Sequence, residues 1–334
     1  MGSLVRIFLS ILLLILLVPG YSGEAPLRRP SGTPSLRATP VALFPLAPHE
    51  RQLGPLTYLG GLRLASGDPA FGGFSALAVE GDRFTLLSDG GNILRFRLGT
   101  DWQPRGARFE SLPEGPGTGW SKEDRDSESM AVDPETGRIW IGFERANAIW
   151  RYAPGFARAE RRARPREMSD WSLNRGPEAM ARLADGSFLV FAEDVVESDA
   201  SLHPALWFRS DPTEPPRRGF AFRFRAPPGY RPVAAAELPS GDILVLTRAV
   251  SIARGFTAKL VVVPRAAIRS GATVTGRTLA TFAPPALHDN FEALAVTREG
   301  GATILWIASD DNESLFQQTL LLKFRLDANA APER

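Results

Sequence analysis

Acidic residues recur in this chain at two places of a repeated sequence pattern. Three glutamates each open a short apolar segment: Glu128, Glu178 and Glu292. Four more acids follow the next apolar segment of a repeat: Asp89, Glu144, Glu193 and Asp310. Carboxylates are ligands that Ca²⁺ and Mg²⁺ prefer, and a positioned carboxyl can act as a general acid or base. All seven are therefore candidate metal ligands, and the three glutamates of the first set are also candidate catalytic residues.

Ca²⁺ is the cation that these residues predict, with Mg²⁺ as the alternative. If the seven acids converge, their like charges raise one another's pKa, and a bound cation relieves that repulsion. The chain has no cysteine and only three histidines, so an oxygen-rich site favours Ca²⁺ or Mg²⁺ over zinc. Such a cation could polarise a phosphoryl or carbonyl oxygen. The opposing interpretation is structural: the acids bond backbone amides of the neighbouring repeat.

Three further residues are candidates for substrate binding: Arg248, His288 and Asn290. Arg248 stands in the fourth repeat where the other repeats have an acid, and a guanidinium can bind an anionic oxygen through two hydrogen bonds. We therefore count Arg248 as a candidate catalytic residue too. His288 and Asn290 shortly precede Glu292, and a histidine at this place could transfer a proton near neutral pH.

Five segments repeat the order strand, turn, strand, acid, strand. They are Phe74 to Leu98, Asp126 to Tyr152, Gly176 to Arg209, Pro232 to Val263 and Asn290 to Leu326. Their spacing of roughly 50 to 60 residues is in the range of one propeller blade. We predict an all-β fold, a β-propeller of five blades, or of six if Val41 to Leu46 or the basic segment Arg158 to Arg166 forms a degenerate blade. The two sets of acids would then meet at one end of the central channel, the channel mouth.

An outer strand is missing from the last repeat, because the chain runs into DANAAPER after Leu326. The segment Leu56 to Leu64 reads as a strand with no repeat before it. Open sheet edges are a liability that a closed ring removes. We therefore expect this N-terminal strand to complete the last blade. The other outer strands are expected at Ala107–Leu112, within Glu167–Leu173, at Gly219–Phe224 and at Thr273–Phe282, with Arg158 to Arg166 as a solvated loop.

The N-terminal sequence predicts that the protein is exported. Arg6 precedes the apolar run Ile7 to Val18, which Pro19 and Gly20 end. The run resembles a secretory signal and is shorter than the roughly 20 residues of a membrane span. We therefore expect a signal peptide at 1–23 and a periplasmic or secreted protein without a stable membrane span. An uncleaved anchor is the alternative.

One propeller domain at 55–327 accounts for most of the 334 residues. It is preceded by a Pro- and Arg-rich linker or extension at 24–54 and followed by a short tail at 328–334. The formal net charge is only +2, and no clustered basic face supports nucleic-acid binding. We expect a monomer that acts on a small-molecule substrate.

Four segments together resemble the phytase-like family, also described as esterase-like activity of phytase, whose members are exported bacterial proteins. They are FGGFSALAVEGDRFTLLSDGG, DSESMAVDPETGRIWIGFE, GPEAMARLADGSFLVFAED and DNFEALAVTREGGATILWIASDDN. The resemblance implies phosphoester or ester hydrolysis, with the family's acids at Glu128, Glu144, Glu178, Glu193, Glu292 and Asp310. The fourth repeat departs from the pattern, with Val233 and Ala234 where an acid is expected.

The function that we predict is therefore hydrolysis of phosphoesters or esters at a cation-dependent acidic site in the channel mouth. Two alternatives remain open. The chain could be a non-catalytic periplasmic propeller that binds a ligand or serves as a scaffold, because a fold alone does not imply activity. It could also be a calcium-dependent enzyme that resembles a lactonase.

Overall fold

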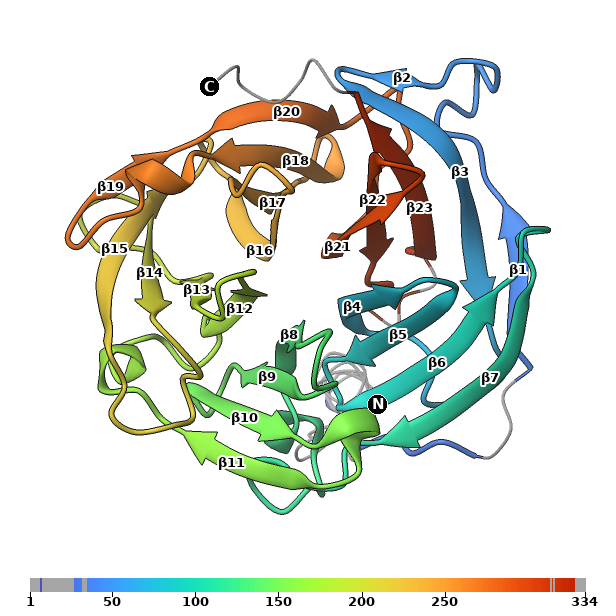
Figure 1. The fold of residues 1–334 in the computed structure, drawn as a ribbon. Helices are drawn as coiled ribbons and strands as arrows, with labels where there is room; N and C mark the ends of the chain where they lie inside the picture. The colour runs from blue at the N-terminus through green and yellow to red at the C-terminus, as the bar shows by residue number, and fades with distance from the viewer. Residues whose placement is uncertain (1–6, 8–26, 32–34, 313, 315, 328–334) are drawn as a thin grey trace.

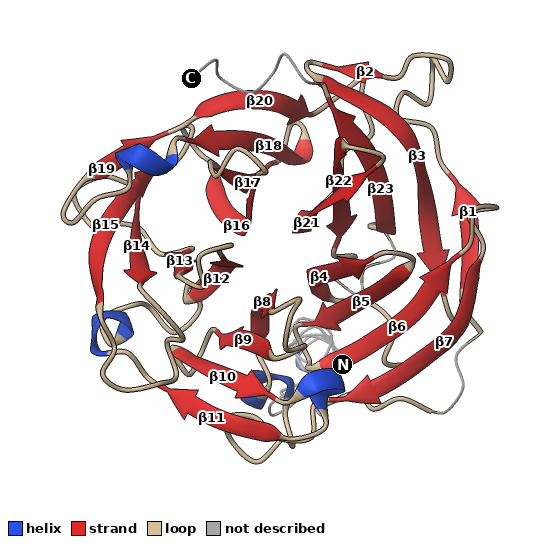
Figure 2. Ribbon diagram, viewed as in Figure 1, coloured by secondary structure: helices blue, strands red, loops and turns tan. Residues whose placement is uncertain are grey.

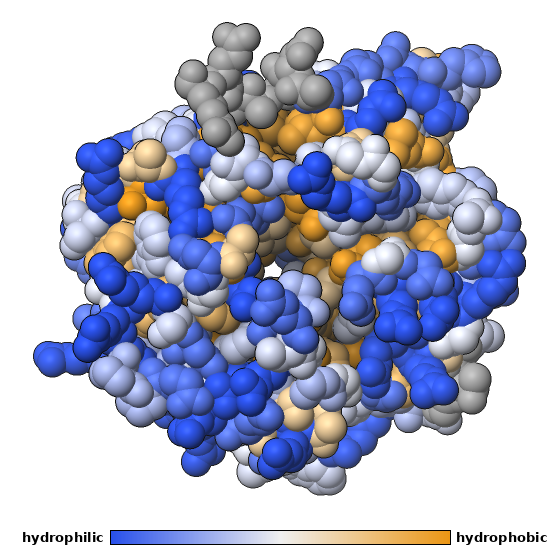
Figure 3. Space-filling view, viewed as in Figure 1, coloured by the Kyte–Doolittle hydropathy of each residue, from blue (hydrophilic) through white to orange (hydrophobic). Residues whose placement is uncertain are grey.

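Five β-sheets surround a central channel in the computed structural model, which describes residues 7, 27–31, 35–312, 314 and 316–327. The sheets stand like blades around a ring (Figure 1), and the helical segments in the described part are short 3₁₀ turns between strands (Figure 2). The space-filling view shows the ring hollowed at its centre (Figure 3). The all-β propeller of five blades predicted from the repeats is thus confirmed.

The first three blades follow the repeats in chain order, except that blade 3 also contains β19 from later in the chain. Blade 1 contains β4 (Phe74–Glu80), β5 (Arg83–Ser88), β6 (Asn92–Leu98) and β7 (Pro104–Ser111). Blade 2 contains β8 (Ser127–Val132), β9 (Ile139–Phe143), β10 (Ala148–Tyr152) and β11 (Ala159–Ala163). Blade 3 contains β12 (Pro177–Arg182), β13 (Phe188–Ala192), β14 (Leu202–Phe208), β15 (Gly219–Arg225) and β19 (Thr273–Thr275). In each blade the first strand of the repeat lies innermost (Figure 1).

The last two blades depart from a simple repeat: blade 4 gives one strand to blade 3, and blade 5 contains three strands from the N-terminal part of the chain. Blade 4 contains β16 (Arg231–Glu237), β17 (Ile243–Ser251), β18 (Gly255–Val263) and β20 (Arg277–Phe282). Blade 5 contains β21 (Phe291–Glu299), β22 (Ala302–Ser309), β23 (Thr319–Leu326), β3 (Leu56–Ala65), β1 (Arg37–Pro40) and β2 (Gln52–Leu53). The connection from β18 to β20 sends β19 outwards to pair in parallel with β15, which ties blade 4 to blade 3.

The N-terminal strand β3 completes the last blade, as the sequence predicted. It pairs antiparallel with β23 along its length, from Leu56 opposite Leu326 to Leu64 opposite Thr319. Strands β1 and β2 pair in turn with β3, and Leu43 between them is fully buried. Residues 35–54 of the predicted linker therefore pack onto blade 5, whereas Leu27 and Arg28 bond to Trp120 and to Asn92 of blade 1.

The basic segment Arg158 to Arg166 was predicted to be a solvated loop, and that prediction is wrong. Residues Ala159–Ala163 form β11, the outer strand of blade 2. Arginines suit this exposed edge, and Arg162 lies over the Trp150 ring at 5.5 Å. The outer strand expected within Glu167–Leu173 is absent, because Arg166–Met168 forms a 3₁₀ turn.

Each junction between neighbouring blades holds its own apolar core. Five clusters of buried side chains join blades 1 and 2, 2 and 3, 3 and 4, 4 and 5, and 5 and 1. Burial of apolar surface is the main force that favours folding. Since a ring of five blades has five junctions, apolar burial holds every blade to both neighbours and fixes the inner strands around the channel.

Phe324→Ala is expected to lower the free energy of unfolding by about 3–5 kcal/mol, the usual cost of removing a buried aromatic ring. Phe324 on β23 is fully buried and packs on Tyr58 of β3 at 5.4 Å and on Phe282 of blade 4 at 5.6 Å. Urea denaturation measures the change. Phe316→Ala is the control, since Phe316 is 96% exposed and its loss should cost little. Equal effects of the two changes would contradict this account of ring closure.

The predicted signal peptide at 1–23, apart from Ile7, and the tail at 328–334 lie outside the described residues. Within the part of the chain that the structure describes, no helix has the length and apolar character needed to cross a membrane.

Candidate functional site

Every innermost strand carries a β-bulge at the same place. The register shifts between Phe74 and Ala76, and at the equivalent point of β8, β12, β16 and β21. The residues inside the five bulges are Ser75, Glu128, Glu178, Val233 and Glu292. A bulge breaks the alternation of a strand and redirects a side chain. Ser75, Glu128, Glu178 and Val233 accordingly line a narrow cavity in the ring centre.

Backbone hydrogen bonds place the second set of acids beside the first. The N–H of Asp89 donates to the carbonyl of Gly73 at 2.8 Å, and Glu144 donates likewise to Asp126 at 2.8 Å. The same bond joins Glu193 to Gly176 at 3.2 Å and Asp310 to Asn290 at 2.9 Å. In each case the acceptor precedes the bulged residue by two positions. In each of these four repeats, the bulged residue and the acid that follows the second strand therefore lie close together at the channel mouth.

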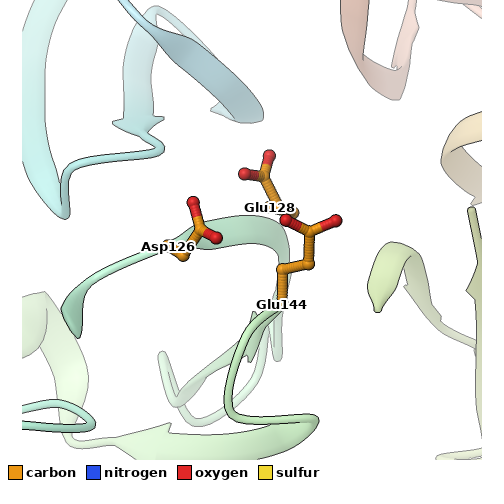
Figure 4. Close-up of side chains that lie close together, drawn as sticks. All are labelled: Asp126, Glu128 and Glu144. Atoms are coloured by element: carbon orange, nitrogen blue, oxygen red, sulfur yellow. The ribbon is translucent and has the colours of Figure 1, made fainter. Parts of the chain in front are cut away.

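Three carboxylates of blade 2 converge most closely. One oxygen from each of Asp126, Glu128 and Glu144 lies within 4.8 Å of the others, and Figure 4 shows the three side chains turned toward a common space. Asp126 and Glu128 flank the start of β8, whereas Glu144 follows β9. Glu144 also shares side-chain hydrogen bonds with Asp126 and Glu178. These oxygens form a donor set that suits a hard cation.

Acids outnumber bases at the channel mouth. Its eight carboxylates are those of Asp89, Asp126, Glu128, Glu144, Glu178, Glu193, Glu292 and Asp310. Three bases form ion pairs with them. Lys122 contacts Asp89, Arg231 contacts Glu193 at 3.0 Å, and Arg248 contacts Glu292 and, at 3.1 Å, Glu193. Within the described residues, no base forms an ion pair with the other five acids, which are Asp126, Glu128, Glu144, Glu178 and Asp310. Their negative charge can therefore be balanced by a bound cation.

Burial and mutual repulsion shift the five mouth carboxyls that form no ion pair with a base toward the protonated form. Burial raises the pKa of Glu128, and the Asp126 and Asp89 charges raise it further. The pKa values of Glu178 and Asp310 are raised by the same two causes. Burial, with the Asp126 charge, raises the pKa of Glu144 to about 7. Groups that titrate near neutrality are suited to proton transfer, and perturbed acids often mark functional sites.

These shifts predict that the cation-free protein loses stability as pH rises from about 5 to 8. A folded carboxyl with a raised pKa favours the folded state at low pH, and that advantage disappears as pH rises through the folded pKa. For Glu144 the rise from 4.5 to about 7 corresponds to a loss on the order of 3 kcal/mol. Urea denaturation in a chelator should show the loss, and Glu144→Gln should reduce it. A stability that is constant or rises over this range would contradict the assignment.

Two other acids, Asp311 and Asp194, do accept backbone N–H groups. Asp311 accepts a hydrogen bond from the backbone N–H of Gly73 in the neighbouring blade at 3.1 Å. Asp194 accepts one from the N–H of Ser172 at 2.7 Å. In the described part of the chain, the side chains of Glu128, Glu144, Glu178, Glu193 and Glu292 accept no backbone N–H. The structural role of holding backbone amides by hydrogen bonds therefore does not account for these glutamates.

Two of the three candidate substrate-binding residues lie at the channel mouth. Asn290 is fully buried, and its side-chain oxygen accepts a hydrogen bond from Arg248 at 2.7 Å. His288 lies in the loop before β21, where its Nδ1 is 2.9 Å from the carbonyl of Ala286. No hydrogen bond or ion pair joins His288 to a mouth carboxylate among the described residues, so the structure does not bring it into the cluster.

Sequence reasoning missed Asp126, Lys122 and Arg231. The position of Asp126 carried a usable signal, since it precedes Glu128 by two residues as Asn290 precedes Glu292. Arg231 has the same offset in the fourth repeat. Lys122 lies in the connection between β7 and β8, outside the repeated pattern, and only the folded structure brings it to Asp89.

Two solved structures illustrate what the fold is similar to. The chain is 13% identical to the glutaminyl cyclase of Myxococcus xanthus, with a TM-score of 0.43 over 77% of this chain and 91% of that one. It is 11% identical to a chain of a nidogen/laminin complex, with a TM-score of 0.41 over 77% of this chain and 86% of that one. At these scores nothing is carried over from either protein. No curated protein matches the chain.

The family comparison is more specific. The model described as "Phytase-like: Esterase-like activity of phytase" matches residues 69–313. This range includes four complete repeats, most of the fifth, and all eight carboxylates of the channel mouth. The resemblance noted in the sequence is thereby confirmed, and the chain belongs to the phytase-like family.

Proposed function

We propose that this protein is an exported hydrolase of phosphoesters or carboxylic esters whose channel mouth binds a divalent cation. Ca²⁺ is the expected ion, and Mg²⁺ is the alternative. The observation that carries the proposal is the convergence of Asp126, Glu128 and Glu144, whose oxygens lie within 4.8 Å of one another and have no basic partner in the described structure. Family membership supports the reaction class.

The residues fit a hard cation by both charge and chemistry. All the candidate ligands are carboxylates, the donors that Ca²⁺ and Mg²⁺ take, and five of the eight form no ion pair with a base in the described structure. Asp126, Glu128 and Glu144 would hold the ion, with Glu178 beside them through its hydrogen bond to Glu144. When bound, the cation would polarise the oxygen of the bond to be cleaved and stabilise the negative charge that develops there.

Proton transfer would fall to the protein's own carboxyls. In ester hydrolysis, water supplies a hydroxyl to the phosphorus or carbonyl carbon, and the leaving alcohol takes up a proton. Glu144, with a pKa of about 7, can hold and release a proton near neutrality, and Glu178, whose pKa burial and the Glu128 charge raise, is a further carboxyl that can hold a proton. A general acid or base works best when its pKa lies near the working pH.

Arg248 would orient the substrate, and the fully buried Asn290 would contribute by holding Arg248. The Arg248 guanidinium bonds Asn290 at 2.7 Å and Glu193 at 3.1 Å, and also contacts Glu292. These bonds occupy two of its nitrogens, which leaves further N–H donors for an anionic oxygen. Glu193 and Glu292 would therefore act chiefly by fixing Arg248. His288 stays a proposed substrate contact from the adjoining loop.

The N-terminal apolar run is the reason for proposing an exported protein that works in the periplasm or outside the cell. Extracellular calcium modules bind their ion with a Kd of about 10⁻⁴–10⁻³ M, so a modest affinity would suffice there. A small-molecule ester as substrate and a monomeric state complete the proposal.

A substrate panel tests the reaction class. The full chain, loaded with Ca²⁺ or Mg²⁺, should hydrolyse a nitrophenyl phosphate or a nitrophenyl carboxylic ester, and a chelator should stop it. Lactones belong in the panel because a preference for them would support a lactonase instead. Binding of the ion without turnover of any substrate would favour the non-catalytic binding propeller.

A further inference from the structure

A groove lies between the neighbouring blades 1 and 2 (Figure 1), at the end of the ring opposite the channel mouth. Its volume is about 560 Å³, which is in the usual range of a small-molecule site. Glu80 and Arg83 of the β4–β5 hairpin line it, as does Gly137 of the β8–β9 turn. Strand β5 begins at Arg83 and ends just before Asp89 of the mouth, so the groove and the acidic site lie at opposite ends of this strand.

The wall that blade 1 contributes to the groove is rich in arginine. The lining residues include one acid, Glu80, and four arginines, which are Arg83, Arg95, Arg97 and Arg108. Arg83 lies directly opposite Arg97 in the pairing of β5 with β6. Arg95 lies directly opposite Arg108 in the pairing of β6 with β7. Like charges directly opposite each other on a sheet are destabilising, so a bound anion would stabilise this arrangement.

Three of the four arginines keep hydrogen-bond donors for a ligand. Arg83 pairs with Glu80 at 3.8 Å and Arg97 with Asp82 at 3.5 Å, in both cases between side chains that are more than half exposed. Long, exposed ion pairs hold an arginine weakly. Arg108 is exposed and forms no ion pair with an acid of the described residues. Because each guanidinium has several N–H donors, these three side chains can bond the oxygens of an anion.

Arg95 reaches across the groove from blade 1 to blade 2. Its guanidinium contacts the Glu110 carboxylate, and a Cβ on Gly155 of blade 2 would lie 3.5 Å from one of its nitrogens. Gly155 has a φ of 65°, a conformation that glycine adopts without steric cost. The Nε of Arg95 is buried and has no hydrogen-bond partner in the described structure. Arg95 is therefore a positioned cation with a donor still unpaired.

Blade 2 supplies an apolar wall to the same groove. Its lining side chains there are those of Met130, Val132, Ile139, Pro154 and Phe156. An anion held by the arginines would have its uncharged part against these side chains, and burial of apolar surface favours binding. A bare inorganic anion would use only the first wall, and a neutral apolar molecule only the second.

We propose that the groove between blades 1 and 2 is a binding site for a small organic anion with an apolar body, such as an aromatic carboxylate or sulfonate. Arg95 and Arg108 bind the charged oxygens of this ligand, and Val132 and Phe156 contact its apolar part. The site is separate from the channel mouth, and the inference does not rest on the proposed function.

Isothermal titration calorimetry of the full chain tests the inference, with 1-naphthoate as the probe. A chelator in the buffer removes any divalent cation, so that the acidic mouth repels the probe. The wild-type chain should bind 1-naphthoate in the groove. The neutral analogue 1-naphthalenemethanol should bind at least about tenfold more weakly, because it lacks the charge that the arginines bond. Inorganic sulfate, which lacks the apolar body, should also bind at least about tenfold more weakly.

Matched variants locate the site. Arg108→Gln and Arg95→Gln should each weaken 1-naphthoate binding about tenfold or more, since each removes a hydrogen bond between charged groups. Val132→Glu keeps all four arginines but adds a negative charge to the apolar wall, and should weaken binding by a similar factor. Arg63→Gln is the control, because Arg63 is an exposed arginine of β3 with no ion pair among the described residues. Its Kd should equal that of wild type, and circular dichroism checks that each variant is folded.

Several results would overturn the inference. They are equal affinity for the neutral alcohol, unchanged binding in the folded Arg108→Gln and Val132→Glu variants, equal weakening by Arg63→Gln, and no binding of 1-naphthoate by wild type at millimolar concentration. Each of these results leaves the proposed function intact, because calcium binding and ester turnover are measured at the channel mouth and not in this groove.

Discussion

Glu128→Gln is expected to lower the rate of ester hydrolysis by at least about 10²-fold, the lower end of what a general acid–base group contributes. Glu128 occupies the bulge of β8 and belongs to the trio whose oxygens lie within 4.8 Å of one another. Its amide replacement keeps the size of the side chain but loses the negative charge that attracts a cation. Both ion binding and the protonation balance of Glu144 and Glu178 would change.

The measurement is turnover of the best substrate of the panel at saturating Ca²⁺, with the bound ion measured in parallel. Glu299→Gln is the matched control, since Glu299 pairs with Lys323 at 2.6 Å on the hairpin between β21 and β22, far along the strand from the bulge. That control should retain wild-type turnover. If Glu128→Gln also retains it, the catalytic site lies elsewhere.

Calcium is expected to raise the thermal unfolding midpoint of the wild-type chain by roughly 5 °C at an ion concentration about a hundred times Kd. Binding to the folded state alone then contributes about 2.7 kcal/mol, and each kcal/mol moves the midpoint of a large domain by about 2 °C. The physical source is the relief of repulsion among the acids, five of which lack an ion pair within the described residues. Differential scanning fluorimetry with and without a chelator measures the shift.

The double change Glu128→Gln with Glu292→Gln should abolish this calcium-dependent shift. It removes the charge of two of the eight mouth carboxylates, while the amide introduced at position 292 keeps one oxygen that can accept a hydrogen bond from Arg248. Because Glu292 also forms an ion pair with Arg248, the doubly substituted chain is compared with itself with and without calcium, so that a change in its cation-free midpoint does not enter the comparison. A full calcium response in this variant would place the ion outside the mouth.

The ring and the two sets of acids could be predicted because both follow from repetition. Each repeat contributes the same strands, so the positions Ser75, Glu128, Glu178, Val233 and Glu292 align in sequence and coincide with the bulges in the structure. Ring closure followed from a count of strands, because the predicted strand Leu56 to Leu64 had no repeat before it to join, and it pairs with β23 in the structure. Periodic patterns and unpaired edges are visible in one sequence.

Features that depend on contacts between distant segments were not visible. Lys122 reaches Asp89 across a connection with no repeat to mark it. The strand Ala159–Ala163 was hidden by its arginines, which read as a solvated loop although Glu160 pairs with the buried Arg151 at 3.0 Å. Strand β19 leaves its own blade to pair with β15. The hydrophobic pattern of a short, exposed outer strand is too weak to predict such pairings.

Diffraction from crystals of the full chain soaked in calcium tests the central claim most directly. The account predicts an ion at the channel mouth, about 2.3–2.6 Å from carboxylate oxygens as calcium requires, with Asp126, Glu128 and Glu144 among its ligands. Anomalous scattering identifies the ion. Crystals in which the mouth binds no calcium at saturating concentration, with its acids protonated or paired only with Lys122, Arg231 and Arg248, would contradict it.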